Sequence, residues 1–163
     1  MTRIVRADAC SLDDLLARRE LVIVIGEGEL RGDAAAAALF GGWSVLMPDA
    51  SMILDTPAAW AGAAWRLGDR AYKLWLAGTT SFDAAGASSE GLCDAIIPAG
   101  RDADEWIKEW IGTRSELALD SAALLIGRRG GDALERAEFA RLFAAGEPQI
   151  GLRAFLNKRT PQF

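Results

Sequence analysis

The chain has 163 residues, 51% of them apolar and 25% charged, and a formal net charge of −5. This length and balance predict one globular domain with a sizeable core. The acidic charge and the lack of a basic stripe argue against nucleic-acid binding. The longest run of branched aliphatic residues, Leu21–Ile25, is too short to cross a membrane. The first ten residues lack the apolar core of a signal peptide, so we expect a cytoplasmic protein.

The sequence contains no histidine. This excludes Ser-His-Asp and Cys-His catalysis and the usual zinc ligand sets, and we expect no metal. Cys10 and Cys93 form no spacing motif, which favours two free thiols in a reducing compartment. No glycine motif of the GxxxxGK[ST] or GxGxxG type occurs. Any catalysis would therefore depend on carboxylates, backbone dipoles, or Lys, Tyr or Cys side chains.

The first hundred residues alternate predicted helices and strands. Ser11 is expected to cap a short helix over LDDLLARR. The apolar run ELVIVI predicts a buried strand. Gly32 and Asp33 then open an alanine-rich helix, with Asp33 as its N-cap. Strands are also predicted at WSVLM and SMIL, around the turn PDA, and at GLCDAIIP. Between them, helices are predicted from Pro57 onward and over DRAYKLWL.

From Asp102 onward the chain is predicted to be helical. The segment DADEWIKEWIG places Trp106 and Trp110 four residues apart on one helix face. SELALDSAALLIG begins with a serine cap, and two more helices are predicted over DALERAEFARLFAAG and PQIGLRAFLNK. Alternating strands and helices followed by a helical cluster predict the α/β class with a C-terminal helical layer. We assign residues 1–100 to the α/β core and residues 101–163 to the helical region of a single domain.

The stretch GEGELRGDAAAAALF, from Gly26 to Phe40, turns sharply from a predicted strand into a predicted helix. Backbone N–H groups at such a helix start can bind an anion or a polarised carbonyl oxygen. Three interpretations are open: an oxyanion site, a place for a catalytic carboxylate, or only a tight turn. The carboxylates near this turn are those of Glu27, Glu29, Asp33 and Asp55. Asp55 precedes Thr56 and Pro57, so it is also a candidate for an Asx turn.

The C-terminal sequence EFARLFAAGEPQIGLRAFLNKRTPQF resembles the tail of the crotonase superfamily, the enoyl-CoA hydratases and isomerases. GLCDAIIP is similar to a strand of that family written GLVDxVVP, and EGELRGDAAAAALFGG resembles its glycine-rich segment NGxALGGGxELAxxCD. The resemblance covers about residues 20–163. It implies a shortened crotonase-like (ClpP/crotonase) spiral of β-β-α units with a C-terminal helical layer.

The resemblance also implies an oxyanion site at the start of the alanine-rich helix. In the family, a glycine triplet there supplies one backbone N–H that stabilises the charge developing on a thioester oxygen. The triplet falls on Gly32, Asp33 and Ala34, so the implied donor is the N–H of Asp33. The carboxylate of Asp33 would lie close to that developing negative charge, which is unfavourable.

The two catalytic glutamates of the family fall on Ala36 and Thr56, and Asp55 stands one position away from the second. Hydration needs two acid/base groups around a water molecule, so the resemblance implies a protein without hydratase activity. Such a protein would bind an acyl-CoA thioester or act as an assembly partner. The alternative is an active isomerase that uses Asp55 as its single base and the Asp33 N–H as oxyanion donor.

The resemblance implies no cofactor other than a CoA thioester ligand, with Phe155 and Lys158 of the tail as its contacts. The other interpretation is that Phe155 is a core residue and Lys158 is solvated. The family also implies a homo-oligomer, a trimer or a dimer of trimers.

No counterpart of the family's front segment precedes the strand ELVIVI, so something is expected to cover the edge of that strand. The candidates are the segment TRIVRA, a second copy of the chain, or a separate protein. The tryptophan-rich helices predict subunit contacts that include Trp106 or Trp110.

Overall fold

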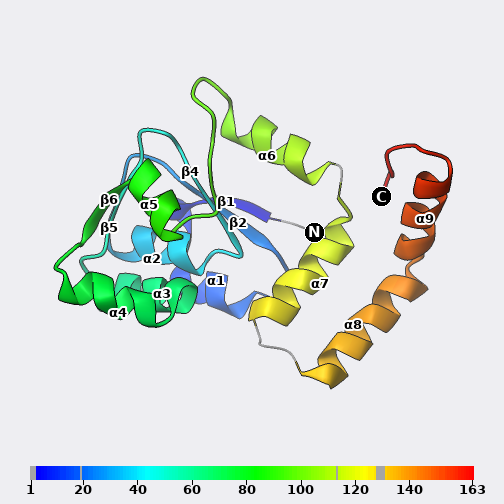
Figure 1. Ribbon diagram of the computed structural model, residues 1–163, viewed down its shortest axis with the longest axis horizontal. Helices are drawn as coiled ribbons and strands as arrows, with labels where there is room; N and C mark the ends of the chain where they lie inside the picture. The colour runs from blue at the N-terminus through cyan, green and yellow to red at the C-terminus, as the bar shows by residue number, and fades with distance from the viewer. Residues whose placement is uncertain (1–2, 19, 113, 128–130) are drawn as a thin grey trace. The chain divides into compact units, whose positions relative to one another are not determined.

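The computed structural model describes residues 3–18, 20–112, 114–127 and 131–163. These residues form two compact units, and Figure 1 labels most of their helices and strands. The αβ unit comprises residues 4–18 and 22–103, and the helical unit comprises residues 3, 20–21 and 104–163, less those outside the described ranges.

Two sheets hold the strands. The first has four strands in the order β1-β2-β4-β7, and the second has three in the order β3-β5-β6. Their bounds are β1 Arg3–Arg6, β2 Val22–Gly26, β3 Glu29–Leu30, β4 Trp43–Leu46, β5 Ser51–Ile53, β6 Ser81–Asp83 and β7 Ala95–Ile96. The pairs β2–β4, β4–β7 and β3–β5 are parallel, whereas β5 and β6 are antiparallel.

Successive β-β-α units explain the parallel pairing. β2 and β3 lead into helix α2 (Gly32–Phe40), and β4 and β5 lead into helix α3 (Pro57–Leu67). The first strand of each unit enters the four-stranded sheet and the second enters the three-stranded sheet, so equivalent strands pair side by side. This arrangement confirms the predicted α/β spiral. The two strands predicted around the turn PDA are β4 and β5, and they lie in different sheets.

Helix α2 is buried almost all round because its alanines allow neighbours to approach closely. Residues 35–39 of this helix are fully buried, and it lies against β2 and α3 (Figure 1). A Cβ atom at Gly62 of α3 would lie 2.6 Å from the Cβ of Leu39, so only glycine fits at this crossing. Small residues on both helices therefore set their separation.

The N-terminal segment answers one question that the sequence left open. β1 is the neighbour of β2 in the four-stranded sheet, so residues 3–6 of the TRIVRA segment cover the edge of that strand. A short 3-10 helix (Ala7–Ala9) and helix α1 (Leu12–Ala17) follow. As predicted, Ser11 caps α1, with its Oγ accepting a hydrogen bond from the N–H of Asp14 at 3.4 Å.

Two more helices complete the αβ unit, α4 (Asp69–Leu76) and α5 (Ala84–Glu90). Helix α4 was expected from its pattern, and its exposed face carries a stacked pair of rings, Tyr72 and Trp75, whose centroids are 6.1 Å apart. Helix α5 was not predicted, although Asp83 caps it by accepting a hydrogen bond from the N–H of Gly86.

The described C-terminal residues are helical, as predicted. The helices are α6 (Ala103–Ile111), α7 (Glu116–Gly127), α8 (Asp132–Ala144) and α9 (Glu147–Leu156). Ser115 caps α7 by accepting a hydrogen bond from the N–H of Ala118 at 3.0 Å. Trp106 and Trp110 of α6 are half-buried, and the guanidinium of Arg114 lies 4.1 Å from the ring centroid of Trp110.

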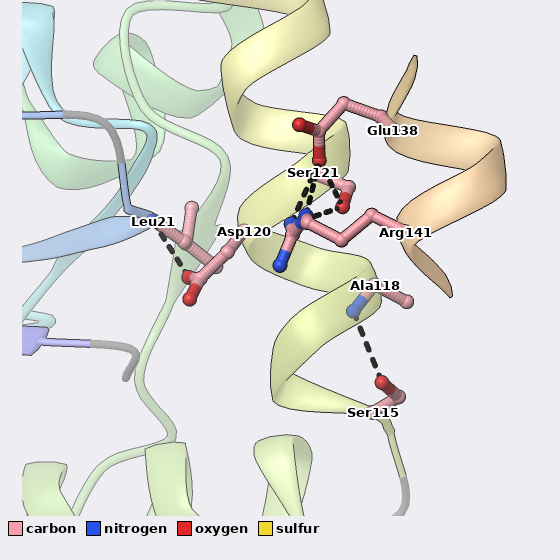
Figure 2. A network of polar contacts seen from close by, with 7 residues as sticks. All are labelled: Leu21, Ser115, Ala118, Asp120, Ser121, Glu138 and Arg141. Carbon is pink, nitrogen blue, oxygen red and sulfur yellow. Dashed lines mark hydrogen bonds and ion pairs between the residues drawn. The ribbon is translucent and has the colours of Figure 1, made fainter. Parts of the chain in front are cut away.

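A polar network ties α7 to α8 (Figure 2). The Oγ of buried Ser121 donates to Glu138 Oε2 at 2.8 Å and accepts from Arg141 Nη2 at 2.7 Å. Arg141 also pairs with Glu138 at 2.7 Å. Close by, Asp120 Oδ1 accepts a hydrogen bond from the backbone N–H of Leu21 at 2.9 Å, across 99 positions of sequence.

Helices α8 and α9 contain no buried residue. Several large apolar side chains in and after them are exposed: Phe139, Phe143, Leu152, Phe155, Leu156 and Phe163. None of the helices within the described ranges is long and apolar enough to span a bilayer.

Candidate functional site at the start of helix α2

Helix α2 begins at Gly32, two residues earlier than an N-cap at Asp33 implies. Arg31 is the N-cap, with extended backbone, and its carbonyl oxygen accepts the N–H groups of Ala34 at 3.0 Å and Ala35 at 3.4 Å. Asp33 therefore lies in the first turn, and the prediction that it is the N-cap is wrong. Gly32, at the turn itself, has a φ of +53°, a conformation that favours glycine.

The carboxylate of Asp55 caps α2 from outside the helix. Its Oδ1 accepts a hydrogen bond from the N–H of Gly32 at 3.1 Å, and its Oδ2 lies 3.7 Å from Nη1 of Arg31. The Asx-turn interpretation of Asp55 is therefore replaced by a contact 23 residues away in sequence. A carboxylate at the positive end of a helix is stabilised by the helix dipole. The side chain of Asp55 is 36% exposed.

The backbone N–H of Asp33 is the free donor at this helix start. The Asp55 carboxylate accepts a hydrogen bond from the Gly32 N–H, and the carbonyl of Arg31 accepts one from the Ala34 N–H. Within the part of the chain that the structure describes, the Asp33 N–H makes no hydrogen bond. The structure thus brings two of the predicted site groups, the Asp55 carboxylate and the Asp33 N–H, to adjacent peptide units.

The positions aligned with the two family glutamates carry no acid. Ala36 is fully buried within α2. The Oγ1 of Thr56 accepts the N–H of Ala59 at 3.2 Å and thereby caps α3. Both residues have structural roles here, and neither side chain exchanges protons near neutral pH.

The two remaining acids near the turn are paired with arginines. Glu27 Oε1 lies 2.9 Å from Arg6 Nε, and Glu29 Oε1 lies 2.6 Å from Arg31 Nε. All four side chains lie at or near the surface. Arg31 is the residue that sequence reasoning missed. The only signal for it was a single positive charge within a cluster of acids.

Phe155 and Lys158 belong to the helical unit. Phe155, in α9, is 79% exposed, so it does not pack into a core of the described chain. Lys158 follows α9 with a φ of +51°, and its N–H donates to the carbonyl of Phe155 at 3.1 Å. A shallow hollow of about 440 Å³ lies at this end of the chain, lined by Arg153, Ala154, Asn157, Arg159, Thr160, Pro161 and Gln162.

Solved structures share this fold. DspI from Pseudomonas aeruginosa is 25% identical, with a TM-score of 0.70 over 93% of this chain and 64% of that one. An enoyl-CoA hydratase from Polaromonas sp. JS666 is 24% identical, with a TM-score of 0.74 over 92% of this chain and 65% of that one. An enoyl-CoA hydratase/isomerase from Cupriavidus metallidurans CH34 is 21% identical, with a TM-score of 0.73 over 91% and 62%.

No protein-family model and no curated protein matches the chain. The chain spans less than two thirds of the length of the solved structures it resembles. The match to those structures extends over 91–93% of this chain, so it includes the parallel sheet and most of the helices described above. The chain therefore has the crotonase fold of the enoyl-CoA hydratases and isomerases, in a shortened form.

Proposed function

We propose that the protein is a divergent relative of the enoyl-CoA hydratases and isomerases that binds an acyl-CoA thioester without hydrating it. The observation that supports this most directly is the chemistry at two positions. Ala36 is buried and Thr56 caps a helix, so these two positions offer no pair of carboxyl groups to activate a water molecule and protonate the substrate.

The groups proposed to bind a thioester lie in both units and are described unit by unit. In the αβ unit, the Asp33 N–H is suited to donate a hydrogen bond to the thioester oxygen. The exposed ring of Phe155 offers a stacking surface for an adenine, and Lys158 offers a point charge for a phosphate. Arg153 and Arg159 line the hollow at this end of the chain, and their guanidinium groups could also bind phosphate.

The test combines an activity assay with calorimetry. Purified protein should not hydrate crotonyl-CoA above background, whereas turnover near about 1 per second would contradict the proposal. Acetyl-CoA should bind, and Lys158→Ala should weaken the binding. Lys108→Ala, which removes an exposed lysine from α6, is the matched control and should leave the affinity unchanged. Equal affinity of the wild type and Lys158→Ala, or no binding, would exclude this role.

The second candidate function is an isomerase with one base. It is favoured by the contact of the Asp55 carboxylate with the Gly32 N–H, directly beside the free Asp33 N–H. In this mechanism Asp55 removes a proton from the carbon next to the thioester, and the electron pair moves onto the thioester oxygen. The Asp33 N–H stabilises the resulting enolate. Asp55 then returns the proton to the far carbon of the original double bond. The double bond thereby moves one position toward the thioester, with no gain or loss of atoms.

Isomerisation of enoyl-CoA and dienoyl-CoA substrates tests this candidate. Asp55→Asn should abolish it, because the amide cannot accept the proton. Asp69→Asn is the control, since Asp69 is an exposed acid in the first turn of α4 and should leave the rate unchanged. An Asp55→Asn variant as fast as the wild type would remove Asp55 from the mechanism.

A further inference from the structure

We propose that Arg31 is a positioning residue that holds the Asp55 carboxylate against the start of α2. This inference rests on the second candidate function, in which Asp55 is the base and the Asp33 N–H is the oxyanion donor. Arg31 does not touch the substrate in this scheme. It acts through Asp55, and so sets where the base stands relative to the donor.

The guanidinium of Arg31 joins two carboxylates. Its Nε lies 2.6 Å from Glu29 Oε1, and its Nη1 lies 3.7 Å from Asp55 Oδ2. The other oxygen of Asp55 is the one that accepts the Gly32 N–H. The carboxylate is therefore held at both oxygens, by a backbone amide on one and by a guanidinium on the other.

The sheet fixes the distance that Arg31 has to bridge. Glu29 lies in β3 opposite Ser51 of β5, and Asp55 follows the end of β5 by two residues. Both carboxylates are thus carried by neighbouring paired strands. Arg31 itself is the N-cap of α2, so its backbone is fixed to the same helix start. A guanidinium presents its donors in a rigid fork, which suits a bridge between two fixed acceptors better than an ammonium does.

The exposure of Arg31 and Glu29 indicates that Arg31 can position Asp55 without contributing much to the free energy of unfolding. The side chains of Arg31 and Glu29 are each 57% exposed. Exposed ion pairs contribute little to the free energy of unfolding. Replacing Arg31 is therefore expected to leave the fold intact while it releases one side of the Asp55 carboxylate.

The first readout is the amide resonance of Gly32 in a two-dimensional ¹H–¹⁵N spectrum. Asp55→Asn removes the charge-assisted bond and defines the reference position of this resonance. Arg31→Gln should move the Gly32 amide proton at least half of the way to that reference, and Arg31→Lys should move it less. Arg6→Gln is the matched control, because Arg6 pairs with Glu27 at 2.9 Å and neither touches Asp55. An Arg31→Gln spectrum that places Gly32 where Arg6→Gln does would overturn the inference.

The second readout is the isomerase assay. Arg31→Gln should lower kcat by about tenfold or more with KM unchanged, because misplacing a catalytic group by about 1 Å has effects of this size. Unchanged kcat in an active protein would also overturn the inference. If the wild type does not isomerise any thioester, the second candidate function fails. The Gly32 resonance then still decides whether Arg31 positions Asp55.

Discussion

Arg66 of α3 satisfies the end of α2 opposite to the candidate site. Its Nε donates to the carbonyl of Leu39 at 2.7 Å, and its Nη2 donates to that of Gly41 at 3.1 Å. Its Nη1 lies 3.0 Å from both oxygens of Asp94, and Asp94 also accepts the N–H of Ser44 at 2.7 Å. One side chain thus joins the last turn of a helix to the starts of two neighbouring strands.

Replacing Arg66 with Met should lower the free energy of unfolding by about 2 kcal/mol, because two carbonyls lose the Arg66 donor and the Asp94 carboxylate loses its ion pair. The side chain of Arg66 is only 10% exposed, so water does not readily take its place. Denaturant unfolding measures the loss. Arg70→Met is the control, since Arg70 pairs with Glu90 at 56% exposure and should cost less than about 0.5 kcal/mol. An equal decrease in the free energy of unfolding for both variants would show that the Arg66 contacts stabilise the fold no more than an exposed ion pair does.

Glu138 makes the contact between α7 and α8 dependent on pH. The hydrogen bond from Arg141, and then that from Ser121, hold the pKa of the Glu138 carboxyl below its ordinary value. A lowered pKa in the folded state means that the ionised form stabilises the protein above the unfolded-state pKa. This stabilisation is lost as the pH falls through the lowered pKa.

Glu138→Gln should therefore be less stable than the wild type at pH 7, and the difference should shrink as the pH falls below about 4. Urea unfolding at a series of pH values measures it. Glu135→Gln, on the same helix and exposed, is the control and should follow the wild type at every pH. A difference between Glu138→Gln and the wild type that stays constant down to acidic pH would contradict the assignment.

At the scale of elements, the contact between α2 and α3 reverses an ordinary rule of helix stability. Glycine within a helix is usually less stable than alanine by about 1 kcal/mol. At Gly62 the added methyl group would lie 2.6 Å from the Cβ of Leu39, which cannot rotate away. Overpacking of this kind typically costs about 1–3 kcal/mol, which exceeds the propensity gain.

Gly62→Ala should therefore destabilise the protein in thermal unfolding, although it improves helix propensity. Ala64→Gly, at an exposed position of the same helix, should also destabilise it, by propensity alone. If Gly62→Ala raises the melting temperature instead, the two helices are farther apart than this contact implies.

The elements that the sequence predicts are those with a long pattern or a clear cap. Ser11 and Ser115 mark helix starts that the structure confirms. β3 and β6, with two and three residues, are too short to show a period and were missed. At the site, Gly32 and Asp55 were both singled out as candidates. Their hydrogen bond was not predictable, because the pairing of β3 with β5 brings them together, and spacing along the chain does not encode it.

At the scale of the whole chain, large apolar side chains remain exposed on each unit. Tyr72, Trp75 and Leu76 are exposed on α4, and Phe139 and Phe143, with centroids 4.5 Å apart, are exposed on α8. Patches of this kind are typical of interfaces. Because β1 already covers the edge of β2, the expectation of a homo-oligomer now depends on these side chains rather than on an open sheet edge.

We expect a closed homo-oligomer whose contacts include Trp106 or Trp110 together with the phenylalanines of α8. Light scattering at micromolar concentration should give a multiple of the 17.4 kDa chain mass. Phe139→Glu should lower the measured mass, whereas Ala137→Glu, at an exposed small residue of the same helix, should not. A monodisperse monomer for the wild type would contradict the prediction.

The hydrogen bond from Leu21 to Asp120 can form only after most of the chain has been synthesised. Leu21 directly precedes β2, and its acceptor is made 99 residues later. While the ribosome extends the chain, the strands and helices of the αβ unit emerge with this amide still bonded to water. Only after α7 has left the exit tunnel can Asp120 replace that water. The residue before the first buried strand therefore gains this polar contact late in translation, and truncated chains that stop before Asp120 never gain it.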